Sequence, residues 1–167
     1  MNKIKHIILI SSIFVLQGCS VYNFTGTGKI DAKTFQVSYF QNVSPLVEPG
    51  IDRDFTRRLQ DLIQNQTNLN LTATDGDLVY EGEIVDYRIS PMSATADLTA
   101  AQSRLSITIN LKFSNKKKPE EDFEKRFSFY DDFSGNNLPT GAQLKKSLEI
   151  IFERISQDMF KDTLAKW

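Results

Sequence analysis

The sequence is nearly devoid of the two side chains on which many catalytic and metal sites depend. Its 167 residues contain one cysteine, Cys19, and one histidine, His6. Once the segment before Cys19 is removed, no histidine remains, and a single cysteine can form no internal disulfide. Ser-His-Asp catalysis, Cys-His catalysis and zinc sites built on these residues are therefore excluded. Carboxylate pairs, Ser-Lys dyads and all-oxygen metal sites remain open, but we expect no enzyme, no metal and no cofactor.

The N-terminus has the pattern of an export signal. Lys3 and Lys5 precede an apolar run, residues 7–16, that is too short to span a membrane. The run ends in Leu16-Gln17-Gly18-Cys19, which resembles the lipobox of bacterial lipoproteins. We therefore expect residues 1–18 to be a cleaved signal peptide and Cys19 to carry the lipid that anchors the protein. A plain secretory signal followed by an incidental cysteine is the alternative.

The charge balance excludes one class of partner. Twenty basic residues face 21 acidic ones, and loss of the two signal lysines leaves a small acidic excess. We expect no nucleic-acid binding from such a chain.

Ser20 stands where an aspartate would favour inner-membrane retention, and no acidic run follows. The expected location is the outer membrane, facing the periplasm.

The rest of the chain is divided into a tether and one domain. Residues 19–33 are rich in glycine and small polar residues, as is typical of a flexible tether. Residues 34–167 are enough for one domain with a substantial core. Alternating apolar residues predict strands, and apolar stripes with helical spacing predict helices. The strands are expected at 34–40, 78–90, 105–113 and 123–130, and the helices at 54–66 and about 142–165.

This order, β-α-β-β-β-α, predicts an α+β fold. Each helix has one apolar stripe and the sheet one apolar face, so a two-layer sandwich buries both. We expect a four-stranded sheet with two helices on one face. Asp52 is the expected N-cap of the first helix, Thr140 a possible cap of the second, and Gly82 the expected site of a β-bulge. The stripe of the second helix comprises Leu144, Leu148, Ile151, Phe152, Ile155, Met159 and Leu164.

Several segments resemble the LptE family of outer-membrane lipopolysaccharide-assembly lipoproteins, most closely its members from Bacteroidetes. The likeness is carried by CSVYNFTGTG (19–28), VEPGIDRDFTRRLQDLIQNQTNL (47–69), GDLVYEGEIVDYRISPM (76–92) and EEDFEKRFSFY (120–130). The resemblance implies a lipoprotein that assembles with and plugs an LptD-type β-barrel. It also implies support of lipopolysaccharide transport, direct binding of lipopolysaccharide, and no catalytic residues.

Basic residues near one predicted turn are the candidates for lipopolysaccharide binding. Phosphates and other acidic groups of this lipid need cations, and arginine can bind phosphate in bidentate fashion. A solubilising turn that protects the sheet edge is the alternative. The candidate residues are Lys116, Lys117, Lys118, Lys125 and Arg126.

Two other functions remain open. A small periplasmic hydrolase would have to use carboxylates such as Glu81, Glu83 and Asp86, although charged residues on a strand usually mark its solvated face. The chain could also be an accessory lipoprotein of another envelope complex. Isolating the protein together with its partners distinguishes these hypotheses.

Overall fold

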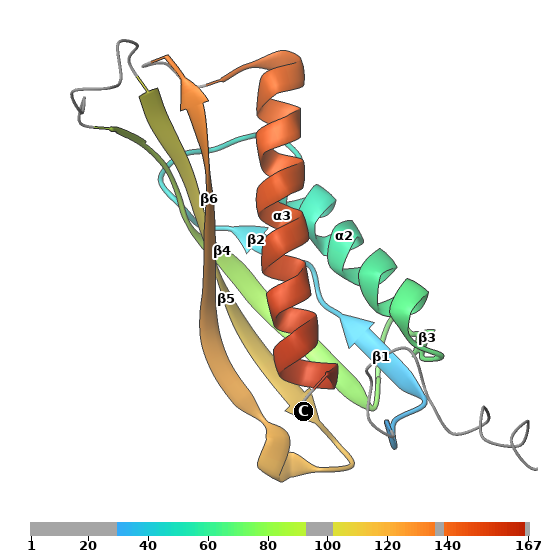
Figure 1. Cartoon of the computed structure of the whole chain (residues 1–167). Coiled ribbons are helices and arrows are strands. Elements are labelled where there is room, and N and C mark those ends of the chain that lie inside the picture. Colours follow the sequence, from blue (N-terminus) through green and yellow to red (C-terminus); the bar gives the residue numbers. More distant parts are fainter. Residues whose placement is uncertain (1–29, 93–101, 136–138, 166–167) are drawn as a thin grey trace, which may run out of the picture.

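The computed structural model describes residues 30–92, 102–135 and 139–165, which form a sheet with two helices on one of its faces (Figure 1). The α+β class and the two-layer arrangement expected from the sequence are confirmed. The signal peptide, Cys19 and the tether up to residue 29 lie outside the described residues. So does most of the small-residue segment between the two longest strands.

The elements are short at the beginning of the domain and long at its end. In chain order they are β1 (Thr34–Val37), β2 (Gln41–Asn42), α2 (Ile51–Gln66), β3 (Asn70–Leu71), β4 (Leu78–Pro91), β5 (Gln102–Asn115), η2 (Pro119–Glu121), β6 (Phe123–Ser134) and α3 (Gly141–Leu164).

The sheet is mixed, and its strand count differs from the prediction. Its order is β3-β1-β4-β5-β6, and β2 pairs separately with β4. The long strands β4, β5 and β6 pair antiparallel, whereas β1 pairs parallel with both β3 and β4. The expected four strands are therefore wrong: the main sheet has five, and there are six in all. The missed strands β2 and β3 have two residues each, which is too short for an alternating pattern.

Helix α2 begins earlier than predicted. Its N-cap is Gly50, with φ of 86°, and not Asp52, which lies in the first turn. Glycine adopts this left-handed conformation without the steric cost that a β-carbon brings. The carboxylate of Asp52 accepts a hydrogen bond of 2.8 Å from the amide of Arg53 instead of capping the helix. In α3 the N-cap is Thr140 as expected, but its side chain makes no capping hydrogen bond.

The irregularity in β4 also lies away from its predicted position. The pairing of β4 with β5 shifts between Ile84 and Asp86, not at Gly82. Leu78, Tyr80 and Ile84 are all buried, so the helix-facing alternation continues through Gly82. The bulge after Ile84 shifts the buried positions from even to odd residue numbers, so that Tyr87 is the next side chain buried on the core side. A glycine without a side chain left this phase ambiguous in the sequence.

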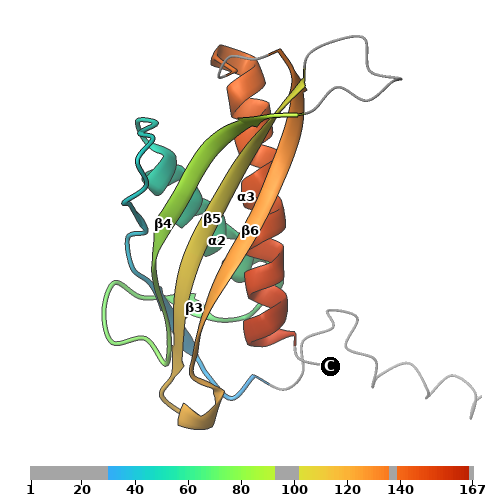
Figure 2. The ribbon, with the colours of Figure 1, turned by 90° about the vertical axis from the view of Figure 1, so that its left-hand side faces the viewer.

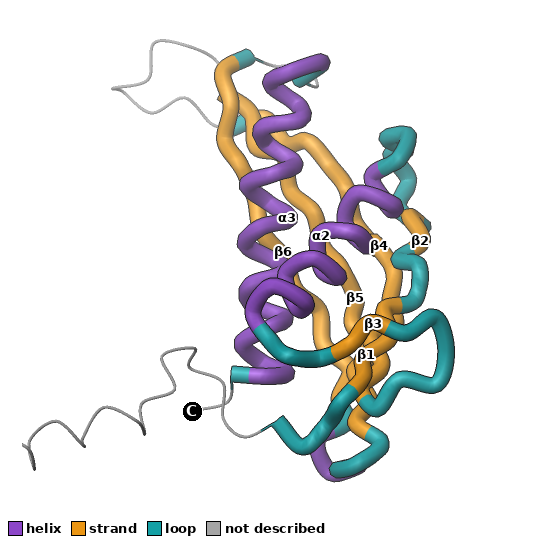
Figure 3. The backbone as a smooth tube through the Cα atoms, turned by 90° about the vertical axis from the view of Figure 1, so that its right-hand side faces the viewer, coloured by secondary structure: helices purple, strands orange, loops and turns teal. Residues whose placement is uncertain are grey.

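The helices divide the sheet between them. α3 packs on β5 and β6, whereas α2 contacts β1, β2 and β3 and lies beside α3 on the same side of the sheet (Figure 3). Three aromatic rings join these parts: Phe55 of α2 makes edge-to-face contacts with Phe40 and with Phe152 of α3, both at 5.2 Å between centroids. Such pairs add about 0.5–1.5 kcal/mol each beyond burial. The helix-facing side of the sheet is thereby fixed as the core side.

Candidate functional surfaces

The other face of the sheet, which we call the open face, has no helix over it among the described residues (Figure 2). Along β5 the buried positions alternate regularly with partly exposed ones, and the buried ones face the helices. Between Leu105 and Phe113 the strand is therefore apolar on the core side and polar on the open face. On β5 the open-face residues are Arg104, Ser106, Thr108, Asn110, Lys112 and Ser114.

Side chains on the open face are linked across strands. Thr108 lies opposite Ser128 in the register, and its hydroxyl donates to the Ser128 hydroxyl at 3.0 Å. The amide of Asn110 donates to Glu124 at 2.7 Å. Such links hold the side chains in fixed positions, so the face presents an ordered polar surface.

A second cluster on the open face contains an arginine stacked on an aromatic ring. Arg104 donates two hydrogen bonds to the Asp132 carboxylate, at 2.7 and 2.9 Å, and its guanidinium carbon lies 3.6 Å from the Tyr130 ring centroid. The hydrogen bond with Arg104 lowers the pKa of Asp132, and the same bond raises the pKa of Arg104. Tyr130 is 45% exposed. Tyrosine and arginine in such a preordered arrangement are typical of protein contact surfaces.

The three carboxylates considered for hydrolysis belong to the solvated part of β4. Glu81 and Glu83 are exposed, and the register places them opposite Lys112 and Asn110 of β5. Asp86 lies beyond the bulge and forms an ion pair of 3.3 Å with Arg88. The bulge brings Asp86 onto the same face as Glu81 and Glu83, because Asp86 lies opposite Thr108, the next open-face residue of β5 after Asn110.

The lysine turn, defined as Lys116–Lys118, lies beside Asp31, close to the first residue that the structure describes. Its lysines do not stand free, because each ammonium group meets an aspartate that comes from another part of the chain. The pairs are Lys116 with Asp75 at 2.6 Å, Lys117 with Asp77 at 3.3 Å and Lys118 with Asp31 at 3.2 Å. The hydrogen bond with Lys116 lowers the pKa of Asp75, and the one with Asp31 raises the pKa of Lys118.

Asp77 holds the start of β1 against this turn. Its carboxylate accepts hydrogen bonds from the backbone amides of Lys33 at 2.9 Å and Thr34 at 3.3 Å, and its own amide donates to the Thr34 hydroxyl. The amide of Lys33, and after it the ammonium of Lys117, lowers the pKa of Asp77 to about 2. Residues 31–34, at the end of the expected tether, are thus attached to the domain.

The structure does not gather all five candidate cations into one site. Lys125 faces α3, where it pairs with Asp162 at 2.6 Å. Arg126 lies opposite Asn110 on the open face. The lysine turn is a third location. The opposite directions of positions 125 and 126 follow from the predicted alternation of the strand. The aspartate partners are distant in sequence, so the sequence alone did not show them.

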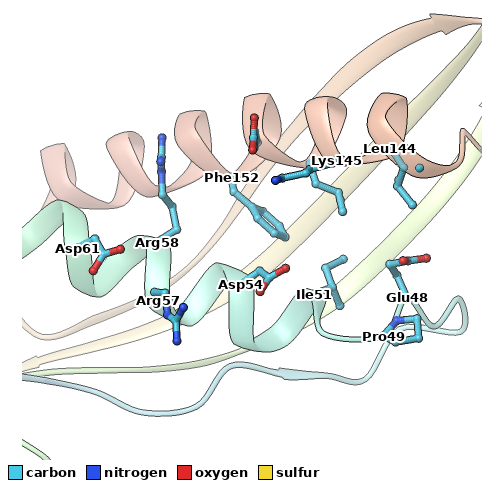
Figure 4. A pocket seen from close by; sticks show the side chains of 13 residues that line it. Glu48, Pro49, Ile51, Asp54, Arg57, Arg58, Asp61, Leu144, Lys145 and Phe152 are labelled. Atoms are coloured by element: carbon cyan, nitrogen blue, oxygen red, sulfur yellow. The ribbon is translucent and has the colours of Figure 1, made fainter.

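A groove between the two helices has no counterpart in the sequence expectations. We call it the interhelical groove; its volume is about 550 Å³, and its walls are α2, α3 and the loop before α2 (Figure 4). Ile51, Leu144, Leu148 and Phe152 supply its apolar surface. Glu48 also lines the groove. Burial of Tyr87 and, as the smaller cause, the negative charge of Glu48 raise the pKa of Tyr87 to about 12.

No helix in the described part of the chain is long and apolar enough to cross a membrane. Among the described residues, no group of three or more histidine, cysteine or acidic side chains is arranged to hold a metal ion.

These features define a two-layer α+β domain that offers polar and mixed surfaces for contact with other molecules. The model of the family described as "LptE: Lipopolysaccharide-assembly" matches residues 32–165, and the chain belongs to this family. It is therefore a non-enzymatic lipoprotein of lipopolysaccharide assembly, consistent with an outer-membrane lipid anchor.

Solved structures with a similar course of the chain include several lipoproteins. A minor lipoprotein from Acinetobacter baumannii is 11% identical with a TM-score of 0.46, over 79% of this chain and 92% of that one. The rare lipoprotein B from Shewanella oneidensis is 12% identical with a TM-score of 0.42, over 76% and 89%. A hypothetical protein from Chlamydia trachomatis is 9% identical with a TM-score of 0.48, over 81% and 98%. No curated protein matches the chain in sequence.

Proposed function

We propose that this protein, anchored in the outer membrane by a lipid on Cys19, assembles with and plugs an LptD-type β-barrel translocon. In this role it supports lipopolysaccharide transport to the outer membrane. Family membership supports the pathway, and we further propose that the chain is a Bacteroidetes-type member.

The observation that carries the plug proposal is the hydrogen-bonded polar surface of the open face. The interior of a transmembrane barrel is polar, so a protein that occupies it must offer polar groups over a wide area. The links from Thr108 to Ser128 and from Asn110 to Glu124 provide such groups in fixed positions. The C-terminal turn of α2 adds a second polar region, in which Gln64, Asn65 and Gln66 are exposed.

Depletion of the protein tests the role as a whole. The level of correctly folded barrel should fall, and cells should become sensitive to large hydrophobic antibiotics. A normal barrel level with an intact permeability barrier would contradict the proposal.

A pair of variants tests which surface is used. Thr108→Trp puts a large ring on the open face, whereas Lys146→Trp puts the same ring on the exposed side of α3. With both variants folded by circular dichroism, Thr108→Trp should reduce co-purification of the barrel and Lys146→Trp should not. Equal recovery of the barrel with both variants would exclude the open face as the contact.

A further inference from the structure

The interhelical groove combines an apolar wall with charges of both signs. Figure 4 shows Phe152 and Leu144 projecting from α3 toward α2, with Ile51 across the gap. Phe152, Leu144 and Ile51 are buried, while Leu148 is only partly buried and lines the groove. A volume of about 550 Å³ lies within the range of about 300–1,000 Å³ usual for small-molecule sites.

Most of the charged groups that line the groove have no ionic partner in the described part of the chain. Arg58 pairs with Glu153 across the two helices and Asp54 with Arg53. No ion pair among the described residues involves the cations Arg57 and Lys145 or the acids Glu48, Asp61 and Glu149, all of which line the groove. Four acidic and three basic side chains line it in total.

This charge pattern decides between possible occupants. A ligand with only negative groups would meet more carboxylates than cations. A molecule with one negative and one positive group, joined to an apolar chain, matches both the rim and the wall.

We propose that the interhelical groove binds a zwitterionic phospholipid of the phosphoethanolamine type. One acyl chain lies against Leu144, Leu148 and Phe152. The phosphate is bound by Lys145, which projects from α3 into the groove, and the ammonium group by the carboxylates at the rim. The site is independent of the open face, so its failure would leave the proposed barrel contact standing.

Photo-crosslinking of the full chain in cells tests this site. p-Benzoylphenylalanine replaces Leu148 in the groove or, as the matched control, Lys146, which is exposed two residues away. After irradiation and purification, mass spectrometry should find a phosphoethanolamine-lipid adduct at position 148 and none at 146. Should the probe at 148 prevent folding, Pro49, which is exposed, uncharged and also lines the groove, takes its place.

The other outcomes overturn the proposal. A polypeptide adduct at 148 would assign the groove to a protein partner, and a lipopolysaccharide adduct would assign it to an anionic lipid. Equal lipid adducts at 146 and 148 would show general membrane contact, and no adduct in a folded protein would leave the groove without a ligand. Lys145→Glu should abolish the adduct at 148, whereas Lys146→Glu should leave it unchanged; retention in Lys145→Glu would disprove the role of Lys145.

Discussion

The ring of Phe40 occupies the space that a side chain at Gly82 would need. A β-carbon built on Gly82 would lie 2.5 Å from Cε1 of Phe40 and 2.1 Å from the backbone oxygen of Asn110. Phe40 is fully buried, and its amide donates to the Thr56 hydroxyl at 3.1 Å. Gly82 is therefore the point where the segment between β1 and β2 packs onto β4.

Gly82→Ala should consequently destabilise the domain. Forcing a methyl group into a packed core costs typically about 1–3 kcal/mol, and here one neighbour is backbone and cannot rotate away. Urea unfolding measures the change, with Glu83→Ala at the next, exposed position as control. A free energy of unfolding equal to that of the control would contradict the close packing of Phe40.

The stripe of α3 predicts a graded series. Ile151 is fully buried, so Ile151→Ala should cost about 2–5 kcal/mol through lost burial and a cavity. Leu148→Ala should cost less, because Leu148 is only partly buried at the groove. Lys146→Ala should cost under about 0.5 kcal/mol. Equal values in denaturant unfolding at Ile151 and Lys146 would mean that this face of α3 does not pack on the sheet.

Asp77 predicts a dependence of stability on pH. Its pKa is about 2 in the folded protein and ordinarily 3.8, so the folded state favours the charged carboxylate. The stabilisation is complete above the ordinary value and is lost as the pH falls toward and through 2. Thermal unfolding of the wild type and Asp77→Asn should therefore differ most at neutral pH and converge in acid. A constant difference at all pH values would show that the carboxylate charge is not what holds Lys33 and Thr34.

Anchoring predicts the fate of a cysteine variant. Cys19→Ala removes the thiol that would carry the lipid, so the precursor should remain unacylated and uncleaved by the lipoprotein signal peptidase. Fractionation and the apparent size on a gel measure both effects, with Ser20→Ala as the adjacent control. Maturation of Cys19→Ala to normal size in the outer-membrane fraction would refute the lipobox interpretation.

The lysine turn predicts a salt-dependent interaction with lipopolysaccharide. Combined replacement of Lys116, Lys117, Lys118 and Arg126 by serine should weaken binding of the full chain, because the phosphates lose their cations. Wild-type binding should weaken with salt, since charges are screened beyond about 8 Å at physiological ionic strength. Lipopolysaccharide titration at two salt concentrations tests this, with Lys146→Ser and Lys161→Ser on the exposed side of α3 as controls. Unchanged affinity in the folded variant would mean that the aspartate pairs are the sole role of these lysines.

The layers of the fold were predictable because they follow from local periodicity. Alternate residues from Leu105 to Phe113 are buried against the helices as expected. Phe55, Leu59, Leu62 and Ile63 form the buried stripe of α2. A strand alternates with period two and a helix repeats every 3.6 residues whatever the remainder of the chain does, so the pattern is visible in the sequence.

Contacts between distant segments were decided only by the tertiary structure. The two-residue strands β2 and β3 exist because β4 and β1 offer them hydrogen-bonding edges, which their own residues do not announce. The cations of the lysine turn acquired aspartate partners at positions 31, 75 and 77 only when the ends of three segments met. The interhelical groove depends on how α2 and α3 lie relative to each other. Local sequence determined which residues face the core, whereas the charge and shape of each surface depended on segments that only the folded chain brings together.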